Sequence, residues 1–239
     1  MLISEGLIVL GKESRFIEGM ALGMWQANCY ILGDVEDGRA VVVDPGQGAE
    51  EPVAERLAAR GVTCEGILLT HGHLDHLWAV PELSRRFDVP VLLHGDDRYL
   101  WEDPGAAFGD LPPGALKAQF GLDWDPPGEA LETFRDGAIF TFAGLHIEAR
   151  HSPGHTPGSS VFLLTDTGAD DPLLLSGDLL FAGSVGRTDF PRGSWEQQMA
   201  SLRDVVLPLE DRTLVLSGHG PETTVGTERR TNPYLAELA

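Results

Sequence analysis

Short apolar runs recur along this chain, each bounded by Gly, Pro or Asp, and their spacing constrains the fold more than any other feature. Runs of this length and composition are typical of β-strands, several of them buried on both faces. We expect strands near residues 29–32, 40–43, 66–69, 89–93, 145–149, 160–164, 173–175 and 214–216.

Amphipathic stretches lie between some of these runs. In residues 50–60, Val53 and Leu57 share one face while Glu51 points outward, as in a helix that covers a sheet. We predict further helices over residues 77–87 and 194–206. Strands that alternate with helices indicate a layered α/β (α+β) architecture. Because one core can organise roughly 250 to 300 residues, we expect a single domain over residues 1–239.

One long segment, residues 98–127, fits neither pattern. It is rich in Pro and Gly, yet it carries apolar rings that need burial, namely Trp101, Phe108, Phe120 and Trp124. We interpret it as an excursion that either shapes the rim of a pocket or packs as a surface loop.

The histidines gather where the predicted strands end. The run over residues 66–70 leads directly into four candidate ligands within six residues, His71, His73, Asp75 and His76. Because positions two apart on a helix point about 200° apart, we place this cluster on a loop that leaves the strand. One candidate ligand follows each of three later predicted strands in the same way, namely His155, Asp178 and His219. Glycines lie beside these residues and let the backbone bend closely.

This set of seven side chains predicts a metal centre. Five imidazoles and two carboxylates suit Zn, Fe or Mn, and seven ligands are too many for one catalytic zinc. We therefore expect two divalent ions, with zinc as the first choice and iron or manganese as alternatives. We assign His71, His73 and His155 to one ion and Asp75, His76 and His219 to the other, with Asp178 bridging the two.

A solvated or capping role is the ordinary role of an isolated loop histidine. We give that role to His94, His146 and His151, although His151 could also bond to a ligating imidazole. The two cysteines, Cys29 and Cys64, form no paired motif and are expected to be inert buried thiols.

The charge balance argues against several partners. Acidic residues number 37 against 17 basic ones, a formal net charge of -20 with no basic run, so we expect no nucleic-acid partner. No segment approaches the roughly 18 apolar residues of a spanning helix, and the N-terminus has no basic region typical of a signal peptide. We expect a cytoplasmic protein, a monomer or a homodimer, without a membrane partner.

The ligand run resembles that of the metallo-β-lactamase superfamily, whose signature is HxHxDH followed by separate His, Asp and His ligands. The resemblance covers nearly the whole chain and implies a four-layer αββα sandwich of two mixed β-sheets, with the site along one edge. Within the superfamily the sequence looks most like short bacterial members of the glyoxalase II (hydroxyacylglutathione hydrolase) group. The segments that carry this resemblance are residues 27–30, 69–76, 152–159, 177–181, 186–193 and 218–235. The Lys and Tyr that this group carries near the Asp178 loop look replaced here by Arg187 and Asp189.

The resemblance implies a metal-dependent hydrolase of thioester or related acyl bonds, which would convert a small-molecule acyl thioester such as S-lactoylglutathione and water into an acid and a thiol. Two dications lower the pKa of a bridging water, so that a hydroxide is available at neutral pH. Asp75 is the expected catalytic residue, orienting the hydroxide and accepting a proton. Arg187 is a candidate for binding a substrate carboxylate, with a structural salt bridge as the equal alternative.

Other functions of the same fold stay open. A persulfide dioxygenase resembles the chain over residues 186–190 and would hold one iron on His71, His155 and Asp178. A lactonase and a non-catalytic metal binder are further alternatives. The SGHG sequence that ends at His219 favours the hydrolase.

Overall fold

The computed structural model describes residues 7–11, 13–109, 111–112, 114–166 and 171–238. Its strands in chain order are β1 (Leu7–Val9), β2 (Arg15–Leu22), β3 (Ala27–Asp34), β4 (Arg39–Val43), β5 (Thr63–Leu68), β6 (Val91–His94), β7 (Leu131–Phe134), β8 (Ile139–Phe142), β9 (Leu145–His151), β10 (Ser160–Leu164), β11 (Leu173–Gly177), β12 (Leu180–Phe181), β13 (Ser184–Val185), β14 (Leu214–Ser217) and β15 (Thr223–Thr224).

The α-helices are α1 (Glu50–Arg60), α2 (Leu74–Leu77), α3 (Val80–Phe87), α4 (Arg98–Glu102), α5 (Ala115–Phe120), α6 (Trp195–Ser201), α7 (Val225–Thr231) and α8 (Pro233–Ala236). Two short 3-10 segments, η1 (Gly95–Asp97) and η2 (Pro104–Phe108), flank α4, and a π-helical turn, η3 (Leu202–Val206), continues α6.

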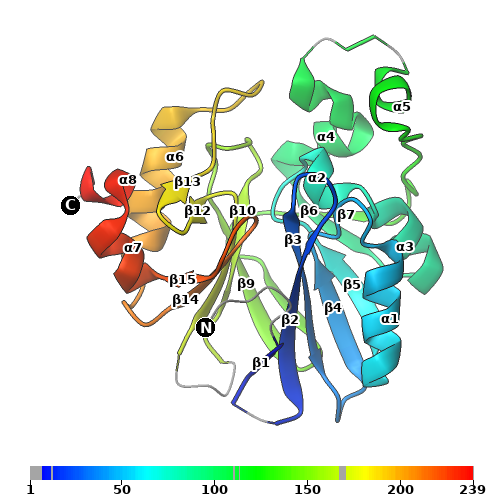
Figure 1. The fold of residues 1–239 in the computed structure, drawn as a ribbon, viewed down its shortest axis with the longest axis horizontal. Helices are drawn as coiled ribbons and strands as arrows, with labels where there is room; N and C mark the ends of the chain where they lie inside the picture. Colours follow the sequence, from blue (N-terminus) through cyan, green and yellow to red (C-terminus); the bar gives the residue numbers. More distant parts are fainter. Residues whose placement is uncertain (1–6, 12, 110, 113, 167–170, 239) are drawn as a thin grey trace.

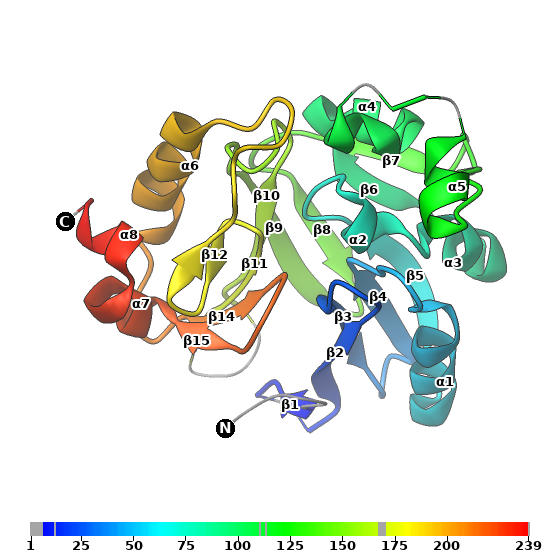
Figure 2. The same ribbon diagram turned by 45° about the horizontal axis from the view of Figure 1, so that its top comes forward.

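Two mixed sheets form the centre of the molecule. One has the order β1-β2-β3-β4-β5-β6-β7 and the other β15-β14-β11-β10-β9-β8, with the small β12-β13 hairpin separate. Figures 1 and 2 both show α1, α3, α4 and α5 on the outer side of the first sheet and α6, α7 and α8 on the outer side of the second. The predicted αββα sandwich is confirmed.

Strand alternation explains the layers. Successive side chains of a strand point to opposite faces, so a strand that is covered on both faces is apolar throughout. In β10, Phe162 and Leu164 enter the apolar cluster between the sheets, whereas Val161 and Leu163 enter the cluster beneath α6 to α8. A third cluster separates the first sheet from α1 and α3. Three apolar clusters therefore join four layers.

The predicted elements differ from the observed ones mainly at their ends. The expected helix over residues 77–87 begins at Val80, because Pro81 has no N–H to donate to an earlier turn and occupies the first turn of α3. Ser194 caps α6 as expected, accepting from the Gln197 N–H. No helix in the described ranges is long and apolar enough to cross a bilayer.

The core between the sheets gives a direct test of the packing. Phe162 is fully buried there, and its ring lies 6.0 Å from that of Phe134. We expect Phe162→Ala to lower the free energy of unfolding by about 3–5 kcal/mol, because it leaves a cavity where relaxation is limited. Ile139→Ala is the control, since that side chain is 70% exposed, and should change stability by less than about 0.5 kcal/mol. Urea unfolding followed by circular dichroism measures both, and equal losses would contradict the packing described.

Candidate metal centre

The strand directions bring the candidate ligands to one edge of the sandwich. Strands β4, β5 and β6 run parallel in the first sheet, and β11 and β14 run parallel in the second. Strand β9 points the same way as β11, because both pair antiparallel with β10. The carboxyl ends of β4, β5 and β6 therefore lie at one edge of the first sheet, and those of β9, β11 and β14 at one edge of the second. These two edges meet, because the seven predicted ligands, which follow β5, β9, β11 and β14, converge there from both sheets.

The two sheets are tied together at this edge. The Asn28 N–H donates to the Gly218 carbonyl (2.7 Å), and the Tyr30 hydroxyl donates to the Ser217 carbonyl (2.7 Å). The Asn28 side chain also donates to Ser217 and to Gly220, at 2.8 and 2.9 Å. Strand β3 of the first sheet therefore holds the segment of the second sheet that carries His219.

The four-ligand run is part loop and part helix, which corrects the expectation of a loop alone. His71 and His73 follow β5, but Asp75 and His76 lie in α2. One helical turn buries Leu74 and Leu77 on the same side, because residues three apart share a face. That turn also directs His76 inward, where it is fully buried.

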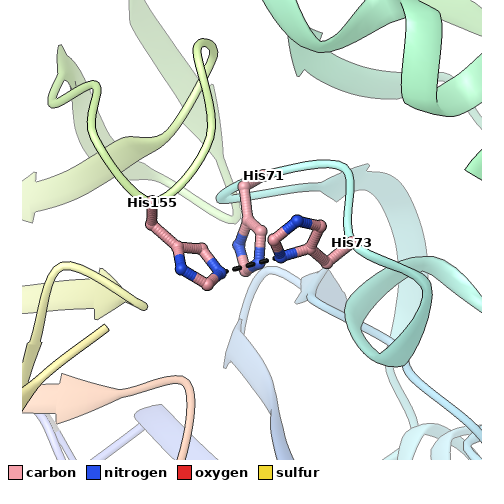
Figure 3. Close-up of side chains that lie close together, drawn as sticks. All are labelled: His71, His73 and His155. Carbon is pink, nitrogen blue, oxygen red and sulfur yellow. Dashed lines mark hydrogen bonds between the residues drawn. The ribbon is translucent and has the colours of Figure 1, made fainter. Parts of the chain in front are cut away.

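The first donor group consists of His71, His73 and His155, all buried. Their ligand nitrogens lie within 4.8 Å of one another, and Nδ1 of His73 is 2.8 Å from Nε2 of His155. Figure 3 shows the three rings pointing toward one another from two separate loops.

The second donor group consists of Asp75, His76 and His219, whose ligand atoms also lie within 4.8 Å of one another. Asp75 Oδ2 is 3.2 Å from Nε2 of His219, and the Nε2 atoms of His76 and His219 are 3.3 Å apart. Asp75 and His219 are partly exposed, so this group faces solvent more than the first.

Asp178 lies between the two groups. Its Oδ2 is 3.4 Å from Nε2 of His155 and 3.6 Å from Nε2 of His219, while its Oδ1 is 3.5 Å from Nε2 of His76. The structure thus brings all seven predicted ligands into one cluster, with the carboxylate of Asp178 in the position that a bridging ligand would need.

Two buried atoms of this cluster have no hydrogen-bond partner, namely His71 Nε2 and Asp178 Oδ1. An unpaired buried polar atom is costly, so each calls for a ligand. Burial and the neighbouring imidazoles lower the pKa values of His71 and His73, which keeps their lone pairs free to bind a cation. The donor set therefore fits divalent metal ions of the zinc, iron or manganese type.

The second group attracts positive charge. Burial disfavours the protonated form of His76, but the carboxylates of Asp75, Asp178 and Asp44 outweigh burial and raise its pKa to about 10. Without a metal, His76 would hold a proton among these carboxylates. A dication would replace that proton, because metal ligation requires the neutral imidazole.

Hydrogen bonds fix which nitrogen each imidazole presents. The Thr70 hydroxyl donates to Asp44 Oδ2 (2.6 Å), so its oxygen can accept from Nδ1–H of His71, 3.0 Å away. The same Asp44 oxygen lies 3.1 Å from Nδ1 of His76, and the Arg187 carbonyl lies 2.6 Å from Nδ1 of His155. All three histidines therefore direct Nε2 toward the cluster, as ligating imidazoles do.

Two buried aspartates that sequence reasoning missed organise these loops. Asp44 follows β4 and, besides the Thr70 hydroxyl, accepts from the Thr70 N–H at 2.8 Å. Asp97 ends η1 after β6 and is fully buried. Both follow predicted apolar runs, which is the same signal that identified the ligands.

Asp97 joins the two loops of the first donor group. Its Oδ2 accepts from the Gly72 N–H (2.9 Å) and from the Thr156 hydroxyl (2.6 Å), and its Oδ1 accepts from the Gly158 N–H (2.7 Å). Gly72 lies between His71 and His73, and Thr156 follows His155. One carboxylate thus sets the separation of the loops that carry all three histidines.

Two glycines allow close approach at Asp178. A Cβ atom on Gly218 would collide with the Asp178 carboxylate, and one on Gly186 would collide with the Asp178 carbonyl and approach Nδ1 of His155. Any larger residue at either position would displace a candidate ligand.

The remaining histidines lie outside the cluster. His146 is exposed, and its Nδ1 is 3.1 Å from the Thr141 hydroxyl. His94 and His151 stack with ring centroids 4.0 Å apart and planes 8° from parallel, a geometry in which their in-plane lone pairs do not converge. His151 Nε2 lies 2.8 Å from the Pro157 carbonyl and so contacts the loop that carries His155 rather than a candidate ligand.

A cavity of about 400 Å³ opens beside the cluster, and Asp75, Asp178 and His219 line it. Phe108 of the predicted excursion also lines it, whereas Trp101 and Trp124 pack against each other, with the Trp124 indole N–H donating to the Trp101 carbonyl. The excursion therefore contributes to the pocket rim and also packs as a surface layer. Arg187 lines the pocket but forms a salt bridge with Asp189, so the structural alternative for its guanidinium is present.

The role of Asp97 can be tested by a change of one atom. Asp97→Asn replaces one acceptor oxygen with an amide nitrogen, which cannot accept, so at least one loop donor loses its partner. We expect a loss of about 1–3 kcal/mol in unfolding free energy and a lower metal content of the purified protein. Asp96→Asn, at an exposed neighbouring position, is the control. Thermal unfolding and elemental analysis measure both effects, and metal content equal to that of the control would contradict this role.

Comparison with known proteins agrees with the geometry. A family profile described as the metallo-beta-lactamase superfamily matches residues 22–219. The chain is 36% identical to the hydroxyacylglutathione hydrolase GloC of Haemophilus influenzae, over 92% of this chain and 97% of that protein. It is 37% identical to the crystallised B3 metallo-beta-lactamase BLEG-1, with a TM-score of 0.78 over 92% of this chain and 99% of that one. It is 36% identical to TTHA1623, crystallised in a di-iron-bound form, with a TM-score of 0.74 over 91% of this chain and 99% of that one. The chain therefore belongs to the metallo-β-lactamase superfamily of metal-dependent hydrolases.

Proposed function

We propose that this protein is a dinuclear metal-dependent thioesterase of the glyoxalase II type, which hydrolyses an S-acyl thiol such as S-lactoylglutathione. The observation that carries the proposal is the position of Asp178, whose Oδ2 lies within 3.6 Å of a nitrogen from each donor group. Two groups of three donors that share one carboxylate support two ions rather than one.

The metals, when bound, would lower the pKa of a coordinated water and polarise the substrate carbonyl. His71, His73 and His155 would hold one ion, Asp75, His76 and His219 would hold the other, and Asp178 would be shared by both. Zinc is the first choice because imidazole and carboxylate suit it, and iron is supported by the di-iron form of TTHA1623.

The protein's own side chains would position the attacking water and accept its proton. Asp75 is partly exposed and lines the pocket, so its carboxylate can contact a water molecule there and accept a proton. Without metal, protonated His76 and hydrogen bonding from His219 outweigh the effect of burial and lower the pKa of Asp75. A dication in place of the His76 proton would also keep this carboxylate ionised at neutral pH. A thiolate leaving group needs little acid assistance, so no dedicated proton donor is required.

A persulfide dioxygenase remains the second candidate, using one iron on His71, His155 and Asp178. The proximity of His219 to Asp75 and Asp178 favours the hydrolase, because a single-iron site leaves that second group without a role. S-lactoylglutathione hydrolysis by protein that holds two ions supports the thioesterase. About one iron per chain with oxygen consumption on glutathione persulfide supports the dioxygenase, and turnover of lactones alone supports a lactonase.

The bridging assignment predicts the behaviour of Asp178→Ala. We expect bound metal to fall from two ions per chain to one or fewer, because both ions lose a charged ligand, and thioesterase activity to fall at least 100-fold. Asp204→Ala, at an exposed position on η3, is the control and should keep both. Elemental analysis and a thiol-release assay measure these quantities. Two ions per chain with full activity would exclude Asp178 as a bridge.

The role of Asp75 can be separated from that of the other ligands by Asp75→Asn. The amide keeps the size of the side chain but accepts no proton, so we expect a fall in kcat of about 100-fold or more for S-lactoylglutathione. The rate is measured at several metal concentrations, so that weakened metal binding is corrected. A saturated rate equal to that of the unchanged protein would remove the proposed role.

A further inference from the structure

The cavity beside the donor cluster has mainly apolar walls. Four aromatic rings come from separate parts of the chain: Trp25 from the β2–β3 turn, Phe108 from η2, Phe181 from β12 and Phe190 from the loop after β13. Leu74, Ala107 and Val185 also line the cavity. Such walls favour an apolar group and disfavour a charged one, which would lose its hydration.

Among the described residues that line this cavity, Arg187 is the one that carries a permanent positive charge. One edge of its guanidinium is already occupied, because Nε donates to Asp189 Oδ1 (2.6 Å) and Nη2 donates to Asp189 Oδ2 (2.7 Å). The same group stacks on the Phe190 ring, 4.3 Å from its centroid. The Nε–Nη2 edge, which could bind a substrate carboxylate in two hydrogen bonds, therefore binds a carboxylate of the protein.

The pair carries no net charge at neutral pH. Hydrogen bonding from Arg187 lowers the pKa of Asp189 to about 2, so both partners stay ionised. A carboxylate on the substrate would meet the Arg187 cation at the cavity wall with the Asp189 anion bonded directly behind it, and would gain little attraction. Because the Arg187 carbonyl also bonds to Nδ1 of His155, the loop holds this pair close to the reacting groups.

We propose that Asp189 is a specificity determinant: by neutralising Arg187 it makes the pocket select thioesters whose acyl group is uncharged, and reject those whose acyl group carries a carboxylate. This inference rests on the proposed thioesterase function and narrows its substrate class.

The test compares two thioesters that differ by one carboxylate group on the acyl part. These are the phenylacetyl and the 4-carboxyphenylacetyl thioesters of N-acetylcysteamine, an uncharged thiol. We expect kcat/KM for the phenylacetyl thioester to exceed that for the carboxylated one by at least tenfold. In Asp189→Asn, where Arg187 keeps its charge without a counter-charge, this ratio should fall by about threefold or more, through a gain in kcat/KM for the carboxylated substrate.

The chain offers a matched control. Arg203 and Asp204 form a salt bridge of the same type on η3, with Nε and Nη2 of Arg203 donating to the two Asp204 oxygens, and neither residue lines the cavity. Asp204→Asn changes the net charge by the same amount and should leave the substrate ratio unchanged. An equal shift in both variants would show a general charge effect and overturn the role of Asp189.

The remaining outcomes are also decisive. Equal or faster hydrolysis of the carboxylated thioester by the unchanged protein would overturn the inference while leaving the thioesterase intact. An unchanged ratio in Asp189→Asn would overturn it as well. Metal-loaded protein that hydrolyses no thioester would overturn the proposed function and this inference together.

Discussion

The whole site depends on one geometric constraint: six strands, from two sheets, end at the same edge of the sandwich. Each sheet by itself supplies an incomplete donor set: the first provides His71, His73, Asp75 and His76, and the second provides His155, Asp178 and His219. The apolar cluster between the sheets holds them face to face, and the bonds from Asn28 and Tyr30 to the β14 end fix their separation at the site. Packing in the centre of the sandwich therefore determines the distances between ligands at its edge.

Such a cluster opposes folding in the absence of metal. Four histidines are buried together, and burial lowers the pKa values of His71 and His73. Asp44 and Asp97 offset part of this cost by satisfying the loop donors. Asp44 also adopts a φ of 51°, a left-handed conformation that Asp tolerates better than most residues. Local backbone strain at Asp44 therefore accompanies the placement of the candidate ligands at this edge.

The sequence predicted the strands that are buried on both faces and the seven clustered side chains, because continuous apolar runs and adjacent His, Asp and Gly are strong local signals. It did not predict β2, β7 or β8, whose partly exposed residues weaken the apolar pattern. Asp44 and Asp97 were missed because an aspartate after a strand is common in ordinary turns. Their importance comes from partners 26 and 61 positions away, such as Thr70 and Gly158, which only the folded chain brings near. The pairing of Arg187 with Asp189 was likewise left open by the sequence and appears only in the folded loop.

An anomalous-scattering map from crystals of the metal-loaded protein would test the proposed dinuclear centre most directly. We expect two peaks per chain, one within the group of His71, His73 and His155 and the other within the group of Asp75, His76 and His219, with Asp178 in contact with both. Two dications that share a carboxylate are expected about 3.5 to 4 Å apart. A single peak at full metal loading, or two peaks without Asp178 between them, would contradict the dinuclear centre.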